Sequence, residues 1–506
     1  MWLPTFGLVA GLLASVALAT NNTNNALHAC AALSSVLPGT VAYPSSPAYA
    51  AGMSYWSALP ATQRPSCLVT PSTSTDVSLV LTTLIHTNTP FTFRAGGHTA
   101  HANGSNINSY GVNVDLARLR TLRVAPDRGS VSVGAGLRWG DVSAALDPLG
   151  LAVLGGRDAD VGVAGLLLGG GFSFFSGRRG WACDGVLAME VVLASGEVVQ
   201  ATAGNEHREL FRALKGGGGA NFGVVTRFDL AAFPQGDVWT RTVVWPGDAR
   251  AAIAEKAMGL VTEGMEADPD AHAYFVRTYQ PDLGGFVNLA SFFHAGPVTQ
   301  GEDASTTTPA VFSPFDEISG ALSNVTAVAN VTAVTSSIST PYGLRRAWSN
   351  LSFAAGSPAL ISELLALWDA SVLALLPRAD AAYAPFVIYQ AVSRGQLRAS
   401  RRRGPNAMGL APEDGPMVVM HFLTGWGDAA LDGVVMRSTR ELVRAAEEAA
   451  RRRGAHREFV YMNYAGEWQD VVRRYGPESY AQLLGTSLRY DPRRDLQRLW
   501  RGYFSF

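Results

Sequence analysis

The sequence predicts an α+β protein with more than one domain, and three observations support this fold class. The chain has 506 residues, of which 47% are hydrophobic, enough to bury a large core. Before about Phe233, short strand-like runs alternate with turns and dense glycines. From about Val238 to Gly454, long helical patterns alternate with further strand-like runs, which predicts a sheet covered by helices.

The first twenty residues, "MWLPTFGLVAGLLASVALAT", predict a signal peptide over residues 1–19. An apolar run from Phe6 to Leu18 meets an A-x-A arrangement at Ala17 and Ala19, although no Lys or Arg precedes it. The run is short for a membrane span, and a buried N-terminal helix is the alternative. We therefore expect a secreted protein with no membrane attachment after cleavage.

Glycosylation triplets and cysteines fit an exported chain. N-x-S/T triplets accept glycans only in exported proteins and only where they are exposed. They occur at Asn21, Asn103, Asn324, Asn330 and Asn350. Of the three cysteines, Cys30 and Cys67 could pair, whereas Cys183 lies in an apolar run and is expected to be a buried free thiol.

Residues 20–62 form a Pro/Ser-rich lead, and the first domain is expected at residues 63–236. A helix over Thr75–His86 and a short buried strand at "PFTFR" come first. Strand pairs follow in "RVAPDRGSVSVGAG" and "MEVVLASGEVV", each broken by turn residues. A glycine-dense stretch, Gly155–Gly180, lies between them, and "KGGGGANFGVVTRFDL" closes the domain with a turn into a strand.

The second domain is expected at residues 237–454. Helical periodicity is long in "ALISELLALWDASVLALLPR" and "LDGVVMRSTRELVRAAEEAARRRG", and strand-like runs are "GGFVNLASFFHA", "APFVIYQAVS" and "GPMVVMHFLTGW". The Ser/Thr/Val stretch from Thr306 to Thr340 is polar and is expected at the surface. Residues 455–506 are expected to return to the first domain.

Charge and spacing disfavour two classes of function. The formal net charge is -1, so no basic field favours a nucleic-acid partner. The run "VSVGAGLRWGD" holds Gly134, Gly136 and Gly140, but it misses the spacing of the dinucleotide fingerprint. We predict no metal site, and we expect a monomer that acts on a small molecule.

Two glycine clusters carry the functional signal. The stretch "FTFRAGGHTAHANGSN" places two glycines directly before His98, and "GGRDADVGVAGLLLGGGFSFF" follows about sixty residues later. Each glycine inside regular structure costs roughly 0.5–1 kcal/mol, so some close approach should offset that cost. A pyrophosphate cradled by backbone N–H groups is one explanation, and packing on protein alone is the other.

Together these clusters resemble the flavin-binding domain of the FAD-linked oxidases related to berberine bridge enzyme and 6-hydroxynicotine oxidase, which share the vanillyl-alcohol-oxidase type of FAD domain. The similarity extends through "ACDGVLAMEVVLASGEVV", "ELFRALKGGGGANFGVVTRF", "ASRRRGPNAMGL" and "YMNYAGEWQDVVRRYGPESYAQLLGTSLRYDP", nearly the whole mature chain. It implies a two-part FAD-binding domain beside an α/β substrate domain with an antiparallel sheet covered by helices. The residues that it implies in FAD binding are Arg94, Ala95, Gly96, Gly97, His98, Thr99, Gly162, Val163, Gly165, Gly169, Gly170, Gly171, Asp184 and Asn463.

In that family the histidine of the R-x-G-G-H motif bonds covalently to the flavin 8α-methyl carbon, so the resemblance implies His98 as the tether. Neutral imidazole is a competent nucleophile near neutral pH. His101 is a weaker rival because no glycine pair adjoins it. Relatives with two links carry a cysteine shortly before the V-G-V-x-G segment, about where this chain has Asp158. We therefore expect a single tether.

The resemblance also implies Tyr464, in the motif "YMNY", as the catalytic base, with Asn463 reaching the flavin. A free tyrosine has a pKa near 10. A base at neutral pH therefore needs a nearby positive charge or hydrogen bond, which the sequence does not identify. The alternative for Tyr461 and Tyr464 is an aromatic strand whose hydroxyls lie at its rim.

Strand alternation selects two candidates for substrate contact, Gln390 and His421, and a core histidine is the alternative for His421. Val163, between Gly162 and Ala164, is small enough to leave room for O2. The expected activity is a secreted FAD-dependent oxidase that moves a hydride from a small alcohol, amine or sugar-like metabolite to flavin N5, with O2 reduced to hydrogen peroxide. The alternatives are an oxidative cyclase or dehydrogenase of secondary metabolism, or a secreted glycoprotein that carries flavin without turnover.

Overall fold

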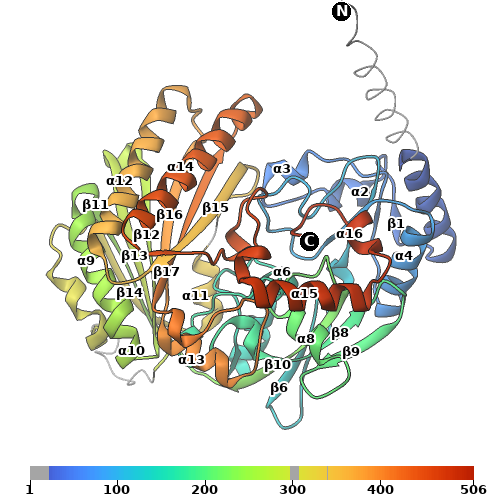
Figure 1. The fold of residues 1–506 in the computed structure, drawn as a ribbon, viewed down its shortest axis with the longest axis horizontal. Coiled ribbons are helices and arrows are strands. Elements are labelled where there is room, and N and C mark those ends of the chain that lie inside the picture. The colour runs from blue at the N-terminus through green and yellow to red at the C-terminus, as the bar shows by residue number, and fades with distance from the viewer. Residues whose placement is uncertain (1–21, 297–306, 339) are drawn as a thin grey trace, which may run out of the picture.

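The computed structural model describes residues 22–296, 307–338 and 340–506. The predicted signal peptide at residues 1–19 therefore lies outside the described residues. Figure 1 shows two halves: a large sheet with helices along its outer face, and a half that holds two smaller sheets. This mixed architecture confirms the predicted α+β fold class.

The first half contains a four-stranded sheet and a six-stranded sheet. The four-stranded sheet has the order β1-β2-β4-β3, and β4 pairs in parallel with both β2 and β3. The six-stranded sheet has the order β5-β6-β10-β8-β9, and β7 also pairs with β10. The strands are β1 (Val41–Ala42), β2 (Cys67–Val69), β3 (Phe91–Arg94), β4 (Val112–Asp115), β5 (Leu122–Val124), β6 (Ser130–Gly134), β7 (Leu151–Val153), β8 (Val186–Val192), β9 (Val198–Thr202) and β10 (Val224–Pro234).

Helices surround these two sheets and share their hydrophobic core. Thr73 caps α4 and forms a reciprocal capping box with Asp76, which fixes the first turn of the helix. The helices are α2 (Pro47–Gly52), α3 (Ala58–Ala61), α4 (Ser74–His86), α5 (Trp139–Leu146), α6 (Val163–Leu168), α7 (Ser176–Arg179) and α8 (Arg208–Leu214). A further helix over residues 22–36 precedes them.

The second half is an eight-stranded antiparallel sheet with the order β14-β11-β13-β12-β16-β17-β15-β18. Its strands are β11 (Val238–Pro246), β12 (Ala271–Gln280), β13 (Gly285–His294), β14 (Ser323–Ala329), β15 (Arg345–Ala354), β16 (Ala384–Val392), β17 (Met417–Trp426) and β18 (His456–Arg457). The helices are α9 (Arg250–Gly259), α10 (Met265–Ala267), α11 (Val331–Ser337), α12 (Pro358–Leu375), α13 (Arg394–Arg402) and α14 (Asp432–Arg452). Helices α9, α12 and α14 cover the outer face of the sheet, as the resemblance implied (Figure 1).

Helix α12 shows why this layer forms. Ser357 caps it and Pro358 occupies its first turn, where a missing N–H costs nothing. Its apolar face then packs into the core under the sheet through Leu364 and Trp368. By length and composition α12 could cross a membrane, but a core helix of this kind passes the same test.

The C-terminal segment crosses from the large sheet to the first half of the molecule, where α15 (Pro477–Tyr490) and α16 (Asp495–Leu499) lie (Figure 1). Near its start, Asn350 of β15 binds the backbone of Tyr461 through both amide atoms, at 3.0 Å each. Asn350 is fully buried, so this predicted triplet does not meet the requirement for exposure. Asn324 and Asn330 are exposed.

The cysteines behave as the sequence suggested. Cys30 and Cys67 form a disulfide that joins the helix over residues 22–36 to strand β2. Cys183 is a buried free thiol.

Glu447 of α14 anchors the C-terminal segment to the helix layer. Its carboxylate accepts hydrogen bonds from Arg474 at 2.6 Å and from Arg451 at 3.2 Å. Burial opposes ionisation, but hydrogen bonds from His456 and Arg474 prevail and lower the pKa of Glu447 to about 2.

We expect Glu447→Gln to destabilise the protein at pH 7 by about 1–3 kcal/mol, the linkage value of a shift from the ordinary pKa to about 2 reduced by solvent screening. Because the folded-state pKa is depressed, this stability is present above about pH 4.5 and is lost as pH falls towards 2. Urea unfolding of the parent and of Glu447→Gln at pH 7 and pH 3 measures the difference in their free energies of unfolding. The exposed neighbour Glu448 provides the control Glu448→Gln. A deficit of equal size at both pH values would contradict the prediction.

Candidate active site

A cavity of about 360 Å³ lies where the glycine segments, the large sheet and the C-terminal segment meet. Four neighbouring strands of the sheet, β12, β16, β17 and β15, supply one wall through Tyr274, Ile388, His421, Leu423 and Trp348. Of the predicted site residues, those that line the cavity are Ala95, Gly96, Gly97, His98, Thr99, Gly162, Gly165, His421, Asn463 and Tyr464.

The two glycine clusters meet at the backbone. A Cβ atom on Gly96 would lie 2.5 Å from the Cα atom of Gly162, and one on Gly162 would lie 2.6 Å from the nitrogen of Gly96. Only glycine allows the two segments to come this close. Gly97 then adopts a φ of +67°, and the chain turns to present His98 to the cavity.

This turn suits an anion or a polar cofactor edge. Throughout the residues that the structure describes, the N–H groups of Gly97, His98 and Thr99 donate no hydrogen bond to another protein group. Gly165 leaves open space where a Cβ atom would stand, so its backbone also faces the cavity. Free N–H groups on a glycine turn are the usual cradle for phosphate oxygens.

His98 has an unusual environment. Its ring stacks on Trp56 with a centroid distance of 4.0 Å, and its Nε2 atom is buried without a hydrogen-bond partner. Burial lowers the pKa of His98 to about 3, and the charges of Arg138 and Arg346 act in the same direction. The imidazole is therefore neutral at physiological pH, with an unused nitrogen at the cavity wall.

Asp158 lies beside this imidazole, where the sequence comparison placed the cysteine of doubly linked relatives. Its Oδ2 atom is 4.0 Å from His98 Nε2, and burial raises the pKa of Asp158 to about 6. Cys30 and Cys67 form their disulfide elsewhere, and Cys183 does not line the cavity.

Tyr464 lies at the C-terminal wall, in a 3₁₀ turn over Met462–Tyr464. Its ring stacks on His421 with a centroid distance of 4.1 Å and an interplanar angle of 4°. Arg157 donates a hydrogen bond to its hydroxyl oxygen at 3.1 Å. Sequence reasoning missed Arg157, although it directly precedes Asp158 in the second glycine segment.

Asn463 extends from the same turn. Its Nδ2 atom donates to the backbone oxygen of Leu166 at 3.0 Å and to the hydroxyl of Tyr461 at 3.1 Å. Asn463 therefore ties the turn that carries the neighbouring tyrosine to helix α6 of the first half.

Three glycines that were predicted to contact the cofactor lie outside the lining of the cavity. A Cβ atom on Gly169 would meet the side chain of Asn463 at 2.0 Å, and one on Gly170 would meet Met408 Sδ at 2.7 Å. Gly171 faces Ala182 and donates its N–H to the hydroxyl of Tyr461. These glycines pack against protein, which was the alternative explanation, and they do not line the cavity.

Val163, predicted to leave room for O2, also lies off the wall. As the first residue of α6 it donates its N–H to the backbone oxygen of Leu137, and its side chain is fully buried in the core. The cavity is lined by Gly162 and Ala164 on either side of it.

Two predicted charged residues are structural in this arrangement. Arg94 pairs with Asp115 of the neighbouring strand β4 and stacks over Tyr55, so it fixes β3 from behind the glycine turn. Asp184 is buried, caps the N–H of Trp181 at 2.9 Å and lies 3.5 Å from the buried Lys215 ammonium.

Gln390 lies on the same face of β16 as Ile388, but it is not among the residues that line the cavity. It is buried opposite Tyr274 in the strand register, and both of its amide atoms lack partners. His421, the other predicted substrate contact, lies at the wall, and its Nε2 atom is buried without a partner. Burial lowers the pKa of His421 to about 3, so its ring is neutral.

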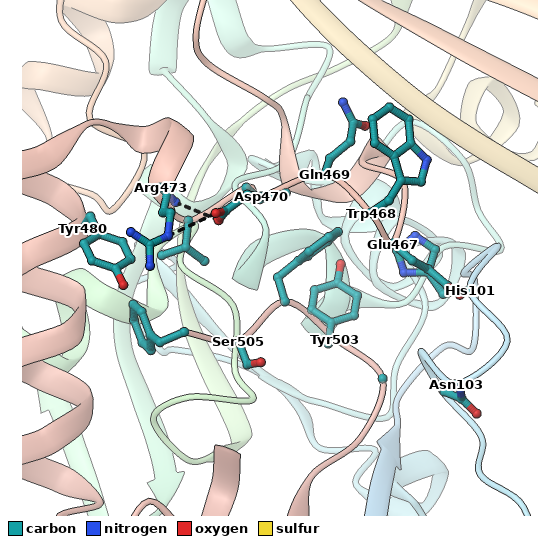
Figure 2. Close-up of a pocket in the computed structure, with 15 residues that line it drawn as sticks. His101, Asn103, Glu467, Trp468, Gln469, Asp470, Arg473, Tyr480, Tyr503 and Ser505 are labelled. Atoms are coloured by element: carbon teal, nitrogen blue, oxygen red, sulfur yellow. Dashed lines mark hydrogen bonds and ion pairs between the residues drawn. The ribbon is translucent and has the colours of Figure 1, made fainter. Parts of the chain in front are cut away.

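A second cavity of about 420 Å³ shares the lining residue Tyr503 with the first (Figure 2). It is lined by the loop over residues 467–473 and by the C-terminal residues 502–506. The ion pair of Asp470 and Arg473, at 3.1 Å, crosses part of it. His101, the weaker rival for the flavin tether, lines this cavity, but none of the other residues predicted for cofactor or substrate binding does.

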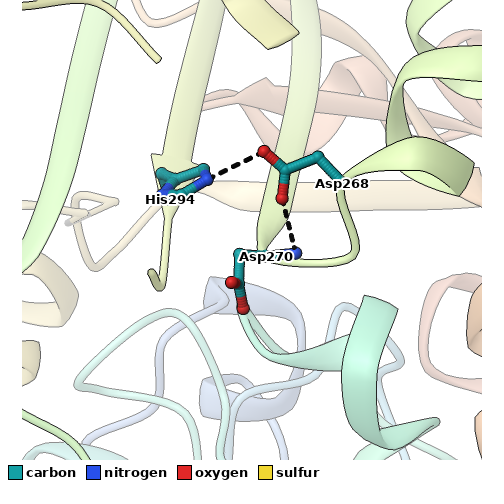
Figure 3. Close-up of side chains that lie close together, drawn as sticks. All are labelled: Asp268, Asp270 and His294. Atoms are coloured by element: carbon teal, nitrogen blue, oxygen red, sulfur yellow. Dashed lines mark hydrogen bonds and ion pairs between the residues drawn. The ribbon is translucent and has the colours of Figure 1, made fainter. Parts of the chain in front are cut away.

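One group of side chains resembles a metal site. Asp268, Asp270 and His294 place ligand atoms within 4.8 Å of one another (Figure 3). His294 Nε2 lies 2.9 Å from Asp268, and Arg178 pairs with Asp270. These protein contacts account for the grouping without an ion.

Known proteins resemble this chain throughout its length. A family model described as an FAD binding domain matches residues 65–202. An FAD-dependent monooxygenase, tpcD of Cochliobolus heterostrophus, is 35% identical over 449 residues, which cover 87% of this chain and 84% of the relative.

Two solved structures share the fold. The 6-hydroxy-D-nicotine oxidase of Arthrobacter nicotinovorans has a TM-score of 0.72 at 20% identity, and the match covers 92% of this chain and 97% of the oxidase. The glucooligosaccharide oxidase of Acremonium strictum, described with a 6-S-cysteinyl, 8α-N1-histidyl FAD, has a TM-score of 0.73 at 16% identity. The match covers 93% of this chain and 97% of the oxidase.

Proposed function

The chain belongs to the berberine bridge enzyme-like family of FAD-dependent oxidoreductases, and from this membership we propose that it is an oxidase of a small organic metabolite. In this proposal a substrate alcohol or amine loses a hydride and a proton, and O2 takes up both electrons to give hydrogen peroxide. The observation that carries it is the pairing of Tyr464 with Arg157 at the cavity wall, beside His421 of the large sheet.

We propose that FAD is held by the glycine turn and by a single covalent bond to His98. Bound there, FAD supplies the two-electron acceptor for the hydride. The neutral imidazole with its unused, buried nitrogen supports the bond to His98. The positions of all three cysteines away from the cavity support one tether rather than two.

Tyr464 is proposed to accept the proton of the substrate O–H or N–H. His421 stacks on its ring and holds the hydroxyl at one place on the wall. Aromatic and aliphatic side chains, among them Trp348, Ile388 and Leu423, form the rest of this wall and exclude water from the proton transfer. The same wall favours a substrate with apolar surface.

Monooxygenation is the second candidate, because the curated relative is named a monooxygenase. That reaction places one oxygen atom of O2 in the product and the other in water, and it consumes two electrons from an external reductant. An oxidase needs no external reductant and releases peroxide.

We also propose that the protein is exported as a glycosylated monomer. The disulfide between Cys30 and Cys67 supports an oxidising compartment, and the exposed Asn324 and Asn330 can accept glycans.

The test is a panel of metabolite alcohols, phenols and amines mixed with the purified protein without O2. The oxidase proposal expects at least one compound to bleach the flavin absorbance and, after O2 is admitted, to yield one peroxide per product. Product that carries ¹⁸O from ¹⁸O2, formed only with added NADH or NADPH, would favour the monooxygenase instead. A flavin that dithionite reduces but no panel compound bleaches would favour the carrier without turnover.

A further inference from the structure

Arg157 has no role in the sequence-based predictions, yet it contacts the proposed base directly. We propose that Arg157 is a positioning residue that fixes the hydroxyl oxygen of Tyr464 and presents its positive charge to that oxygen during proton transfer. This inference rests on the proposed role of Tyr464 as the base.

The guanidinium of Arg157 is fixed from several directions. One terminal nitrogen donates to the Tyr464 hydroxyl oxygen at 3.1 Å, and the other lies 3.0 Å from His272 Nε2. Its carbon lies 5.0 Å from the ring centroid of Tyr274 and 5.5 Å from that of Phe172. A planar cation held by two aromatic faces and one imidazole has little freedom to leave the tyrosine oxygen.

Both histidines near the base are neutral. Burial, followed by the charge of Arg157, lowers the pKa of His421 to about 3. The same two causes hold the pKa of His272 well below its usual range. Neutral His272 therefore serves as the acceptor for Arg157, and neither ring can offer a positive charge to Tyr464.

The neighbouring tyrosines are neutral as well. Burial raises the pKa of Tyr274, and it raises the pKa of Tyr461 strongly. Tyr461 lies in T-shaped contact with Tyr464 at a centroid distance of 4.9 Å. Among the groups in contact with Tyr464, Arg157 is therefore the one that carries a permanent positive charge.

The charge of Arg157 is not consumed by an ion pair. No carboxylate in the part of the chain that the structure describes lies within 4.0 Å of its guanidinium nitrogens. Asp158, the adjacent residue, is the carboxylate at the cavity wall. Burial raises its pKa to about 6 against the opposing charges of Arg138 and Arg157, so it is ionised at neutral pH, but it forms no ion pair with Arg157. A partly buried arginine without a carboxylate partner favours a nearby oxygen that can become an anion.

Tyrosine labelled with ¹³C at Cζ tests the proposal without a substrate. The pH titration of the Tyr464 signal, assigned with Tyr464→Phe, is followed by NMR in the flavin-loaded protein. In Arg157→Met the pH at which this signal changes is expected to rise by about 1–3 units, the usual effect of losing an opposite charge. Arg157→Gln keeps a hydrogen-bond donor but loses the charge, so the pH at which the Tyr464 signal changes is expected to rise by a similar amount. Arg157→Lys keeps the charge, and in this variant that pH is expected to stay near the value of the parent.

Arg179→Met is the matched control, because Arg179 also stacks on an aromatic ring, at 3.5 Å from the Phe233 centroid, but lies outside the cavity. It is expected to leave the Tyr464 titration unchanged. An unchanged titration in both Arg157→Met and Arg157→Gln would overturn the inference. If Tyr464→Phe turns over as fast as the parent, the proposed base fails instead, whatever the titration shows.

Discussion

Replacing Tyr464 by phenylalanine is expected to lower kcat by about 10²–10⁴-fold, the usual contribution of a positioned general base. The substitution removes one oxygen atom and leaves the ring, which stacks on His421 at 4.1 Å and on Phe172 at 6.3 Å. Packing therefore changes little, and KM should stay within a few-fold of the parent. The rate of flavin bleaching without O2, measured by stopped flow with a substrate from the panel, reports the loss.

Tyr475→Phe provides the same chemical change outside the cavity. The Tyr475 hydroxyl donates to the backbone oxygen of Gly216 at 2.9 Å, so its removal should cost about 0.5–1.5 kcal/mol of stability and leave the bleaching rate unchanged. A Tyr464→Phe protein that bleaches as fast as Tyr475→Phe would end the assignment of Tyr464 as the base.

The sequence predicted well those features that depend on local backbone chemistry. Two glycines before His98 predicted a turn that presents the imidazole, and the structure shows Gly97 at positive φ with His98 at the cavity. Strand alternation selected His421 as a candidate for substrate contact, and the structure places it at the cavity wall. Periodicity alone was enough to predict a sheet covered by helices.

The sequence could not show contacts whose partner is distant in the chain. Gly170 looked like part of an anion cradle, but the side chain that fills the space beside it is Met408, more than two hundred residues away. The carboxylate of Asp184 likewise contacts residues from other segments, since it pairs with Lys215 and accepts a hydrogen bond from Asn406. Arg157 was missed because its partners, His272 and Tyr464, come from a strand and a turn that only the tertiary fold brings together.

His98→Ala is expected to release the flavin from covalent attachment. In the parent, acid precipitation should leave all of the yellow colour in the pellet, and in the variant the colour should pass into the supernatant. The glycine turn and the packing of Gly96 against Gly162 remain, so we expect FAD to bind reversibly after the change. Because the pKa of His98 is lowered to about 3, its imidazole is neutral throughout the pH range of ordinary expression, and attachment in the parent should not vary between pH 6 and 8.

His101 is the matched control, since it lies three residues away in the same loop. Its Nε2 atom lies 2.8 Å from the backbone oxygen of Ala465 and within 3.0 Å of Trp348 Nε1, and the ring does not line the first cavity. The Nε2 atom of His101 is already engaged by protein groups and the ring lies away from the cavity, so His101→Asn should keep its colour in the pellet. Colour that stays in the pellet of His98→Ala but leaves that of His101→Asn would transfer the tether to His101, and mass spectrometry of the peptide that carries both histidines would identify the modified ring.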